Sequence, residues 1–253
     1  MTVALLASLA LSARASVTEA RVVVVKGTVT TTAPASSQEQ PAVRNAEISV
    51  GSSIGTAQKS SILMEPTPGS AVMVLEQSKV VLTADDLKKT GETIIGRKTF
   101  LNLSQGKVQA ALAHPQNGGV DFKIKTPQCV AAARGTVYSV TTNGNSTTIL
   151  VGQGSVVVTW TFHGKTYTKI VSAGQELTVF TDGTSTSPDV TVQDLDALRQ
   201  FAQEAALLLA NDESKDRGFP GYFSSPNAGP DTSQTDPGAN GTFPGQTSQV
   251  TNK

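Results

Sequence analysis

The sequence has few of the side chains from which catalytic and nucleic-acid-binding sites are usually built. It holds one cysteine, two histidines and one tryptophan among 253 residues, and aromatic residues make up only 5% of the chain. One cysteine forms no internal disulfide, and scarce aromatic rings argue against stacking platforms for single-stranded nucleic acid. The 20 basic and 20 acidic residues cancel, so no basic field attracts phosphates or an anionic membrane. We therefore expect no nucleic-acid partner.

The cysteine, Cys129, has no candidate base near it in the sequence. It belongs to the apolar run 129–133, where a lone thiol usually packs as a small hydrophobic side chain. The two histidines, His114 and His163, both lie at turns, and they make no metal-ligand set. Catalysis would require Cys129 to meet one of them in a cleft. We expect a protein without catalytic residues, cofactor or metal, and an enzyme that uses Cys129 and a histidine is the less favoured alternative.

The N-terminus is typical of an export signal. The apolar stretch Val3 to Leu11 precedes Ala13-Arg14-Ala15, a small-residue pattern that signal peptidase accepts. We interpret residues 1–15 as a candidate signal peptide, and a short buried helix is the alternative. No other stretch approaches the ~20 apolar residues of a membrane-spanning helix. We therefore expect a periplasmic or extracellular protein with no membrane span after signal removal.

Residues 16–187 have the pattern of consecutive β-strands. Runs rich in β-branched residues, such as ARVVVVKG, SKVVLT and SVVVTWTF, alternate with glycine-bearing turns such as SQGK, QNGG and GQGS. A turn every ~8–12 residues predicts an all-β domain, either an antiparallel β-sandwich or a β-roll built of hairpins. The adjacent Asp85 and Asp86 lie in a charged cluster, LTADDLKKTGET. We expect this cluster to form a solvated turn or a short helical excursion.

The C-terminal part of the chain has a different pattern. Thr191 and Asp194 resemble a capping box. Apolar residues follow at helical spacing, namely Leu195, Leu198, Ala202, Ala205 and Leu209. Residues 188–212 are predicted to form one amphipathic helix, which packs on the β domain or, as the alternative, binds a partner. Residues 213–253 are rich in Gly, Pro and Ser and are predicted to be a disordered tail.

The order of short motifs in the β region resembles that of FecR-type periplasmic domains. The matching segments are Val25-Lys26-Gly27-Thr28-Val29, Val50-Gly51, Leu103-Ser104-Gln105-Gly106-Lys107-Val108, Phe122-Lys123-Ile124-Lys125-Thr126-Pro127, Arg134-Gly135-Thr136-Val137-Tyr138-Ser139-Val140, Val151-Gly152-Gln153-Gly154-Ser155-Val156 and Ala173-Gly174-Gln175. The resemblance, over about residues 21–179, implies an exported β domain with a part in signal sensing. The family's best-known members resemble membrane-spanning regulators of sigma factors. Here we expect no cytoplasmic segment before the domain, and Glu76-Gln77-Ser78 stands in place of the family's D-G-S turn. Direct control of a sigma factor is therefore not expected.

The candidate binding residues lie in two short stretches. Gly135 is expected at a bend, Thr136 contributes a strand hydroxyl, and Arg134 caps carbonyl groups or binds an acidic group of a ligand or partner. Trp160 and Phe162 share one strand face, where a core or cross-strand role competes with sugar recognition.

These observations predict an exported, non-catalytic protein-binding or scaffold module of the bacterial cell envelope. Its partner would be an envelope protein or another surface component, contacted through strand edges and loops, with a possible part in signal sensing. One alternative is a module that binds cell-wall or surface polysaccharide. Another is a structural role in which the protein associates with itself along its strand edges.

Overall fold

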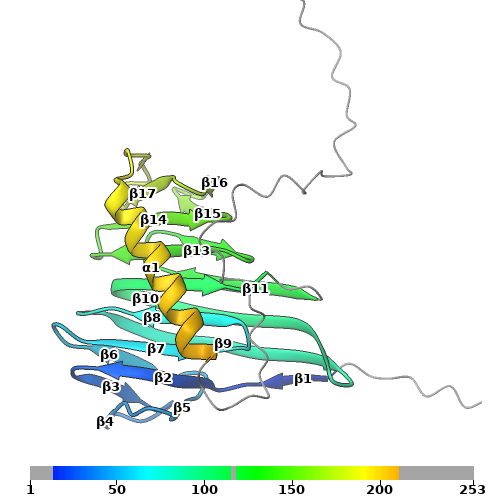
Figure 1. The fold of residues 1–253 in the computed structure, drawn as a ribbon. Coiled ribbons are helices and arrows are strands. Elements are labelled where there is room, and N and C mark those ends of the chain that lie inside the picture. The colour runs from blue at the N-terminus through cyan, green and yellow to red at the C-terminus, as the bar shows by residue number, and fades with distance from the viewer. Residues whose placement is uncertain (1–13, 115–117, 211–253) are drawn as a thin grey trace, which may run out of the picture.

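The computed structural model describes residues 14–114 and 118–210, which form two facing β-sheets and one helix (Figure 1). The helix, α1 (Val192–Ala210), lies crosswise over the outer face of one sheet. This architecture confirms the predicted all-β fold of hairpins with one C-terminal amphipathic helix. Residues 1–13, which hold most of the candidate signal peptide, and the predicted tail 213–253 lie outside the described residues.

The first sheet, sheet A, presents its outer face away from α1. Its strand order is β4 (Glu39–Pro41), β3 (Val29–Thr32), β6 (Ser53–Thr56), β9 (Lys79–Thr90), β10 (Thr93–Leu112), β11 (Gly119–Lys125), β12 (Val130–Ala133), β15 (Ser155–Phe162) and β16 (Lys165–Ser172). β1 (Arg14–Val17) pairs with the second half of β9, on the same side of that strand as β6. Among the described residues, β16 pairs with β15 alone and so forms one border of the sheet.

The second sheet, sheet B, lies between sheet A and the helix. Its order is β5 (Glu47–Ile48), β2 (Ala20–Lys26), β7 (Ser61–Glu65), β8 (Ser70–Val74), β10, β13 (Val137–Thr142), β14 (Ser146–Gln153), β17 (Glu176–Phe180) and β18 (Ser185–Thr186). Successive hairpins alternate between the two sheets, so the chain winds around a shared core.

The long strand β10 belongs to both sheets and turns the corner between them at Gly106. Its first part pairs with β9, and from Gly106 onward it pairs with β13 and β8. Gly106 has φ 93°, and a Cβ there would collide with the side chain of Ser78. The Ser78 hydroxyl accepts a hydrogen bond from Lys107 N (2.9 Å). Gly106 thus adopts a positive φ and lies close to Ser78, and a residue with a side chain would be strained in this position.

The same arrangement recurs where β2 of sheet B leads into β3 of sheet A. Gly27 has φ 72°, a Cβ on it would collide with the Ser60 hydroxyl, and Thr28 N donates to that hydroxyl (2.9 Å). Two of the glycine motifs that carry the family resemblance therefore form sheet corners, each closed by a serine.

One strand pair departs from the antiparallel pattern that the sequence predicts for hairpins. β10 and β11 run parallel, with Gly96 beside Gly119 and Asn102 beside Lys125. Because β10 ends in sheet B, the chain must return to sheet A before it can add the next strand there. β11 therefore starts next to the beginning of β10 and runs in the same direction.

Apolar side chains form two layers, one between the sheets and one beneath the helix. The inner layer includes Phe122, Tyr138 and Trp160. The outer layer joins Leu198, Phe201, Ala202, Ala205 and Leu209 of α1 to sheet-B residues that include Val23, Leu63, Ala111 and Leu150. Asp194 N donates to Thr191 Oγ1 (3.2 Å), which caps the first turn of the helix. The amphipathic stripe thus packs on the β domain.

The expectation of a solvated turn or helical excursion around Asp85 and Asp86 is wrong. Both residues lie inside β9, and Asp85 is fully buried, where it accepts a hydrogen bond from Thr99 Oγ1 (2.9 Å). The cause is a register shift near Thr83, because Leu82 pairs with Leu101 whereas Ala84 pairs with Phe100. Because of the extra residue, the side chain that points into the core after Leu82 is that of Asp85 and not that of residue 84. The two-residue alternation of a strand is therefore interrupted in the sequence.

Candidate functional site

The motif residues Arg134, Gly135 and Thr136 lie together between β12 and β13, and each makes a local contact. Thr136 is buried, and its hydroxyl donates to Ser155 O (3.1 Å). Gly135 has φ 65° and abuts His114. Arg134 is exposed, and its Nη2 lies 3.5 Å from Gly118 O. Only Arg134 presents a polar side chain to solvent at this bend.

The second pair of candidate residues, Trp160 and Phe162, lies near the end of β15. Trp160 is only 8% exposed, its ring stacks on Tyr167 with centroids 5.5 Å apart, and its Nε1 donates to Gly183 O (3.1 Å). Phe162 is half-buried and stacks on His163 (4.0 Å between centroids). The indole face is therefore occupied within the protein, which leaves little of it for a sugar ring.

The structure does not bring Cys129 into a reactive setting. The residue is 4% exposed, and burial raises the pKa of its thiol to about 11. Its Sγ lies 3.6 Å from Thr126 Oγ1, whereas His114 and His163 are both exposed. Across residues 14–114 and 118–210, no group of three or more His, Cys, Asp and Glu residues could hold a metal ion.

A groove of about 470 Å³ lies on the outer face of sheet A, where β9, β10 and β11 meet. We call it the glycine groove, because Gly96 and Gly119 lie side by side on the two parallel strands. No atom of residues 14–114 and 118–210 lies within 4 Å of the position that a Cβ on Gly119 would take, so among these residues this part of the groove is open. The lining residues are Asp86, Lys88, Ile95, Gly96, Arg97, Lys98, Gly119, Val120 and Asp121.

Local backbone geometry creates the glycine groove. The register between β9 and β10 shifts between Ile94 and Gly96, which leaves Ile95 as an extra residue. Gly118 has φ 81°, and a Cβ on it would collide with the backbone of Ile95. Gly118, just before β11, thus lets the chain approach the bulge closely, and Gly119, the first residue of the strand, leaves the surface there without a side chain.

Charged side chains of both signs line the groove and the face beside it. Lys98 Nζ lies 3.2 Å from Asp86 Oδ2, and Lys123 Nζ lies 2.8 Å from Asp121 Oδ1. Both ammonium groups also approach the ring of Phe100, at 5.0 Å and 4.6 Å from its centroid. Such mixed, partly exposed pairs suit recognition of a partner with complementary charges better than attraction of a polyanion.

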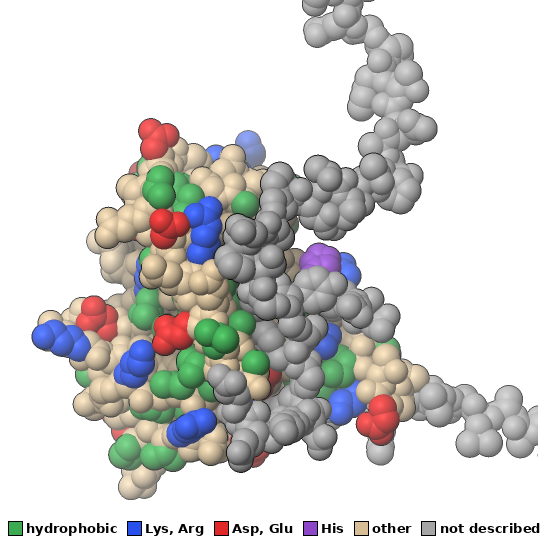
Figure 2. Space-filling view, in the orientation of Figure 1, with side chains coloured by type: hydrophobic (Ala, Val, Ile, Leu, Met, Phe, Trp, Pro, Cys, Tyr) green, Lys and Arg blue, Asp and Glu red, His purple; other side chains and the backbone are tan. Residues whose placement is uncertain are grey.

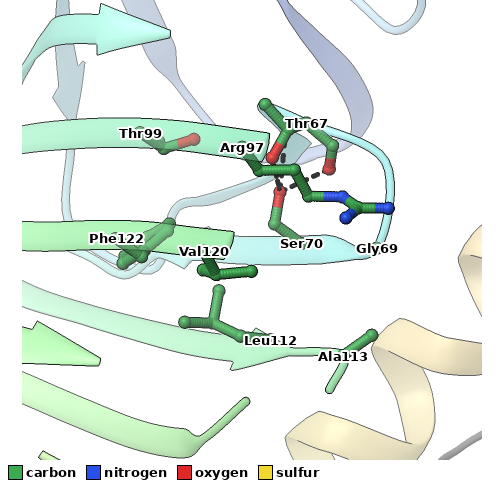
Figure 3. A pocket seen from close by; sticks show the side chains of 9 residues that line it. All are labelled: Thr67, Gly69, Ser70, Arg97, Thr99, Leu112, Ala113, Val120 and Phe122. Carbon is green, nitrogen blue, oxygen red and sulfur yellow. Dashed lines mark hydrogen bonds between the residues drawn. The ribbon is translucent and has the colours of Figure 1, made fainter. Parts of the chain in front are cut away.

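A much smaller cavity lies between the sheets behind the groove (Figure 3). It has a volume of about 10 Å³, and its lining includes Thr67, Ser70, Thr99 and Arg97. Arg97 Nε donates to Pro68 O (2.8 Å), and burial lowers the pKa of this guanidinium below its usual value. The space is about one water molecule in size, so it admits no organic ligand. Arg97 thus ties sheet A to the loop between β7 and β8.

On the part of the helix-bearing side that Figure 2 leaves uncovered, charged side chains of neither sign form a cluster. In Figure 2, basic and acidic side chains are interspersed among apolar ones on this face. Within the described part of the chain, no helix combines the length and the apolar character needed to cross a bilayer.

The fold and its corner motifs define an all-β domain of two facing sheets. Residues 52–157 match the FecR protein family, and the chain therefore contains a FecR-type domain. The matched region holds the Gly106 corner, the bend at Gly135 and every residue of the glycine groove. No curated protein sequence matches the chain.

Two crystal structures of a candidate anti-sigma factor from Parabacteroides distasonis ATCC 8503 show a distant likeness. They are 13% and 14% identical to this chain, with TM-scores of 0.43 and 0.42. The alignments cover 57% of this chain and 63% and 62% of those chains, so less than two thirds of their length is matched.

Proposed function

We propose that this protein is an exported, non-catalytic protein-binding module of the bacterial cell envelope, with a part in signal sensing. The match of residues 52–157 to the FecR family supports a regulatory rather than an enzymatic role. The inert setting of Cys129 and the exposed, separate histidines agree with this reading. The buried Trp160 weighs against the alternative of a polysaccharide-binding module.

The observation that carries the proposal is the glycine groove. It combines an open floor at Gly119, an apolar wall from Ile95, and paired charges from Asp86 and Lys98. Its volume of about 470 Å³ is large enough for side chains of a docking segment. A partner segment with an apolar side chain for the floor and charges for the walls would pair its polar groups on binding.

Site-specific photocrosslinking in cells that export the protein tests this proposal. A photoreactive amino acid at Lys88, in the groove wall, is compared with the same group at Arg199 on the exposed face of α1. We expect one discrete protein adduct from position 88 and none of that mass from position 199. Gly119→Val should abolish the adduct, because the new side chain fills the groove without a steric clash in the free protein.

The matched control is Thr161→Val, a β-branched substitution on the same sheet face but outside the groove. It should leave the adduct unchanged. Equal adducts from positions 88 and 199, or an adduct that persists in Gly119→Val, would contradict a partner site in the groove. Recovery of glycan rather than protein at position 88 would favour the polysaccharide alternative.

A further inference from the structure

The border strand β16 has one edge that no other strand of the described residues pairs with. It has eight residues, Lys165–Ser172, and among the described residues it pairs with β15 alone. All of its residues except Tyr167 and Val171 are exposed. Since every second residue of a border strand turns its backbone N–H and C=O outward, such an edge is a ready template for a further strand.

The outer face of the β15–β16 hairpin carries no charged residue that would repel a second sheet edge. Ile170 is 62% exposed and pairs with Val157, which is 40% exposed. The rest of this face carries hydroxyl side chains, with Ser155 opposite Ser172, Thr159 opposite Thr168 and Thr161 opposite Thr166. An edge with exposed aliphatic and threonine side chains favours strand addition.

The other face of β16 carries two lysines, and these restrict which strand can be added. Lys165 Nζ lies 5.3 Å from the ring centroid of Tyr167, and Lys169 Nζ donates to Ser187 Oγ (2.7 Å). A cation directly opposite either lysine would be destabilising. The lysines therefore limit the registers in which a further strand can pair with β16.

We propose that a second copy of this chain pairs antiparallel with β16, with Thr168 opposite Thr168 of the partner subunit. In this register Lys169 faces the partner's Tyr167, Thr166 faces the partner's Ile170, and no lysine faces a lysine. A register centred on Tyr167 would place Lys165 against the partner's Lys169, and one centred on Lys169 would place that residue against itself. The Thr168-centred register alone among these three avoids like charges.

The end of the edge supports the same register. Ser172 N already donates to the side chain of Gln175 (Oε1, 2.9 Å), so this backbone group is not available to a partner. Pairing centred on Thr168 uses residues 166–170 of each copy and does not need Ser172. Pairing centred on Lys169 would need it.

Cysteine crosslinking of the purified full chain tests this proposal. Directly opposite residues of an antiparallel pair have Cα atoms about 4.5–5.5 Å apart, within reach of a disulfide. Thr168→Cys should therefore give a disulfide-linked homodimer on mild oxidation, with a yield at least about tenfold above that of Thr161→Cys, because pairing raises the effective concentration of the thiols. Thr166→Cys should not link to itself, since its neighbour in the partner is Ile170. The wild-type chain, whose Cys129 is buried, supplies the background.

A second measurement does not depend on thiols. Sedimentation of the wild-type chain should show a concentration-dependent dimer, and Thr168→Lys, which places lysine against lysine, should remove it. Monomer at every concentration together with background crosslinking of Thr168→Cys would overturn the proposal. Equal self-linking of Thr166→Cys would overturn the register. Because β16 lies outside the glycine groove, failure here leaves the groove test unaffected.

Discussion

Gly135 lies so close to His114 that no side chain fits between them. A Cβ on Gly135 would collide with the His114 imidazole, and the backbone of Gly135 adopts φ 65°. Gly135→Ala is therefore expected to lower the free energy of unfolding by about 2–4 kcal/mol, through backbone strain and steric overlap. Chemical denaturation measures this loss.

Gly144 provides the matched control for Gly135. It also has a positive φ, 89°, but no atom of the described part of the chain lies within 4 Å of its Cβ position. Gly144→Ala should cost only the backbone strain, about 1–2 kcal/mol. The double variant Gly135→Ala with His114→Ala should recover part of the loss. Equal losses for the two glycines would show that the contact with His114 contributes nothing.

The buried thiol of Cys129 should react slowly with thiol reagents. Its pKa of about 11 leaves few thiolates at pH 8, so labelling of the folded protein should be about two orders of magnitude slower than that of a free cysteine. Unfolding in denaturant should restore the ordinary rate. Rapid labelling of the folded chain would contradict the buried setting and would reopen the reading of Cys129 as a nucleophile.

Glu176 should reduce stability at neutral pH. Burial, and secondly the charge of Asp194, raise the pKa of this carboxyl, so the fold disfavours its ionised form. Glu176→Gln is expected to raise the free energy of unfolding at pH 7 by about a few tenths of a kcal/mol, a small gain because solvent screens the site. A higher melting temperature of the variant at pH 7 would report this gain. The advantage should vanish as the pH falls below the usual carboxyl range, where the native glutamate is neutral. The exposed Glu92→Gln should change little, and a Glu176→Gln effect of the same size at pH 4 and pH 7 would contradict this cause.

Substitutions at two leucines of α1 test whether the helix is packed on sheet B. Leu198 is 1% exposed and lies over Gly152, whereas Leu207 is 65% exposed. Leu198→Asp should release the helix, expose the apolar outer face of sheet B and increase binding of a hydrophobic dye, at a cost of about 3–5 kcal/mol. Leu207→Asp should do neither. Similar dye binding by the two variants would argue against a docked helix.

Local patterns predict the elements whose structure depends on nearby residues. The N-cap of Thr191 and the helical spacing from Leu195 to Leu209 predict α1, and the observed helix, Val192–Ala210, follows them. The motif glycines predict bends because a positive φ is a local property. Gly135 is an example, expected at a bend and found at φ 65°.

The glycine groove depends on pairing between distant segments, so its parts could not be assembled from the sequence. Gly96 and Gly119 become neighbours only because β10 changes sheets and β11 returns parallel to it. The sequence around Asp85 and Asp86 predicts a turn or a short helical excursion instead of a strand, because the extra residue Thr83 interrupts the alternation of β9. Gly96, within the run IIGRK, is a local signal of an irregular strand. It does not show which residue of another strand lies beside it.

The most direct test of a partner site in the glycine groove is a calorimetric measurement of partner binding. The protein identified by photocrosslinking is purified without a crosslink, and its affinity is measured for the wild-type chain, for Gly119→Val and for Arg199→Glu. Gly119→Val should weaken binding at least about tenfold, which corresponds to about 1.4 kcal/mol. Arg199→Glu, on the helix, should leave Kd within about twofold of the wild-type value, as expected for a residue outside the interface. An unchanged Kd for a folded Gly119→Val chain would contradict the account.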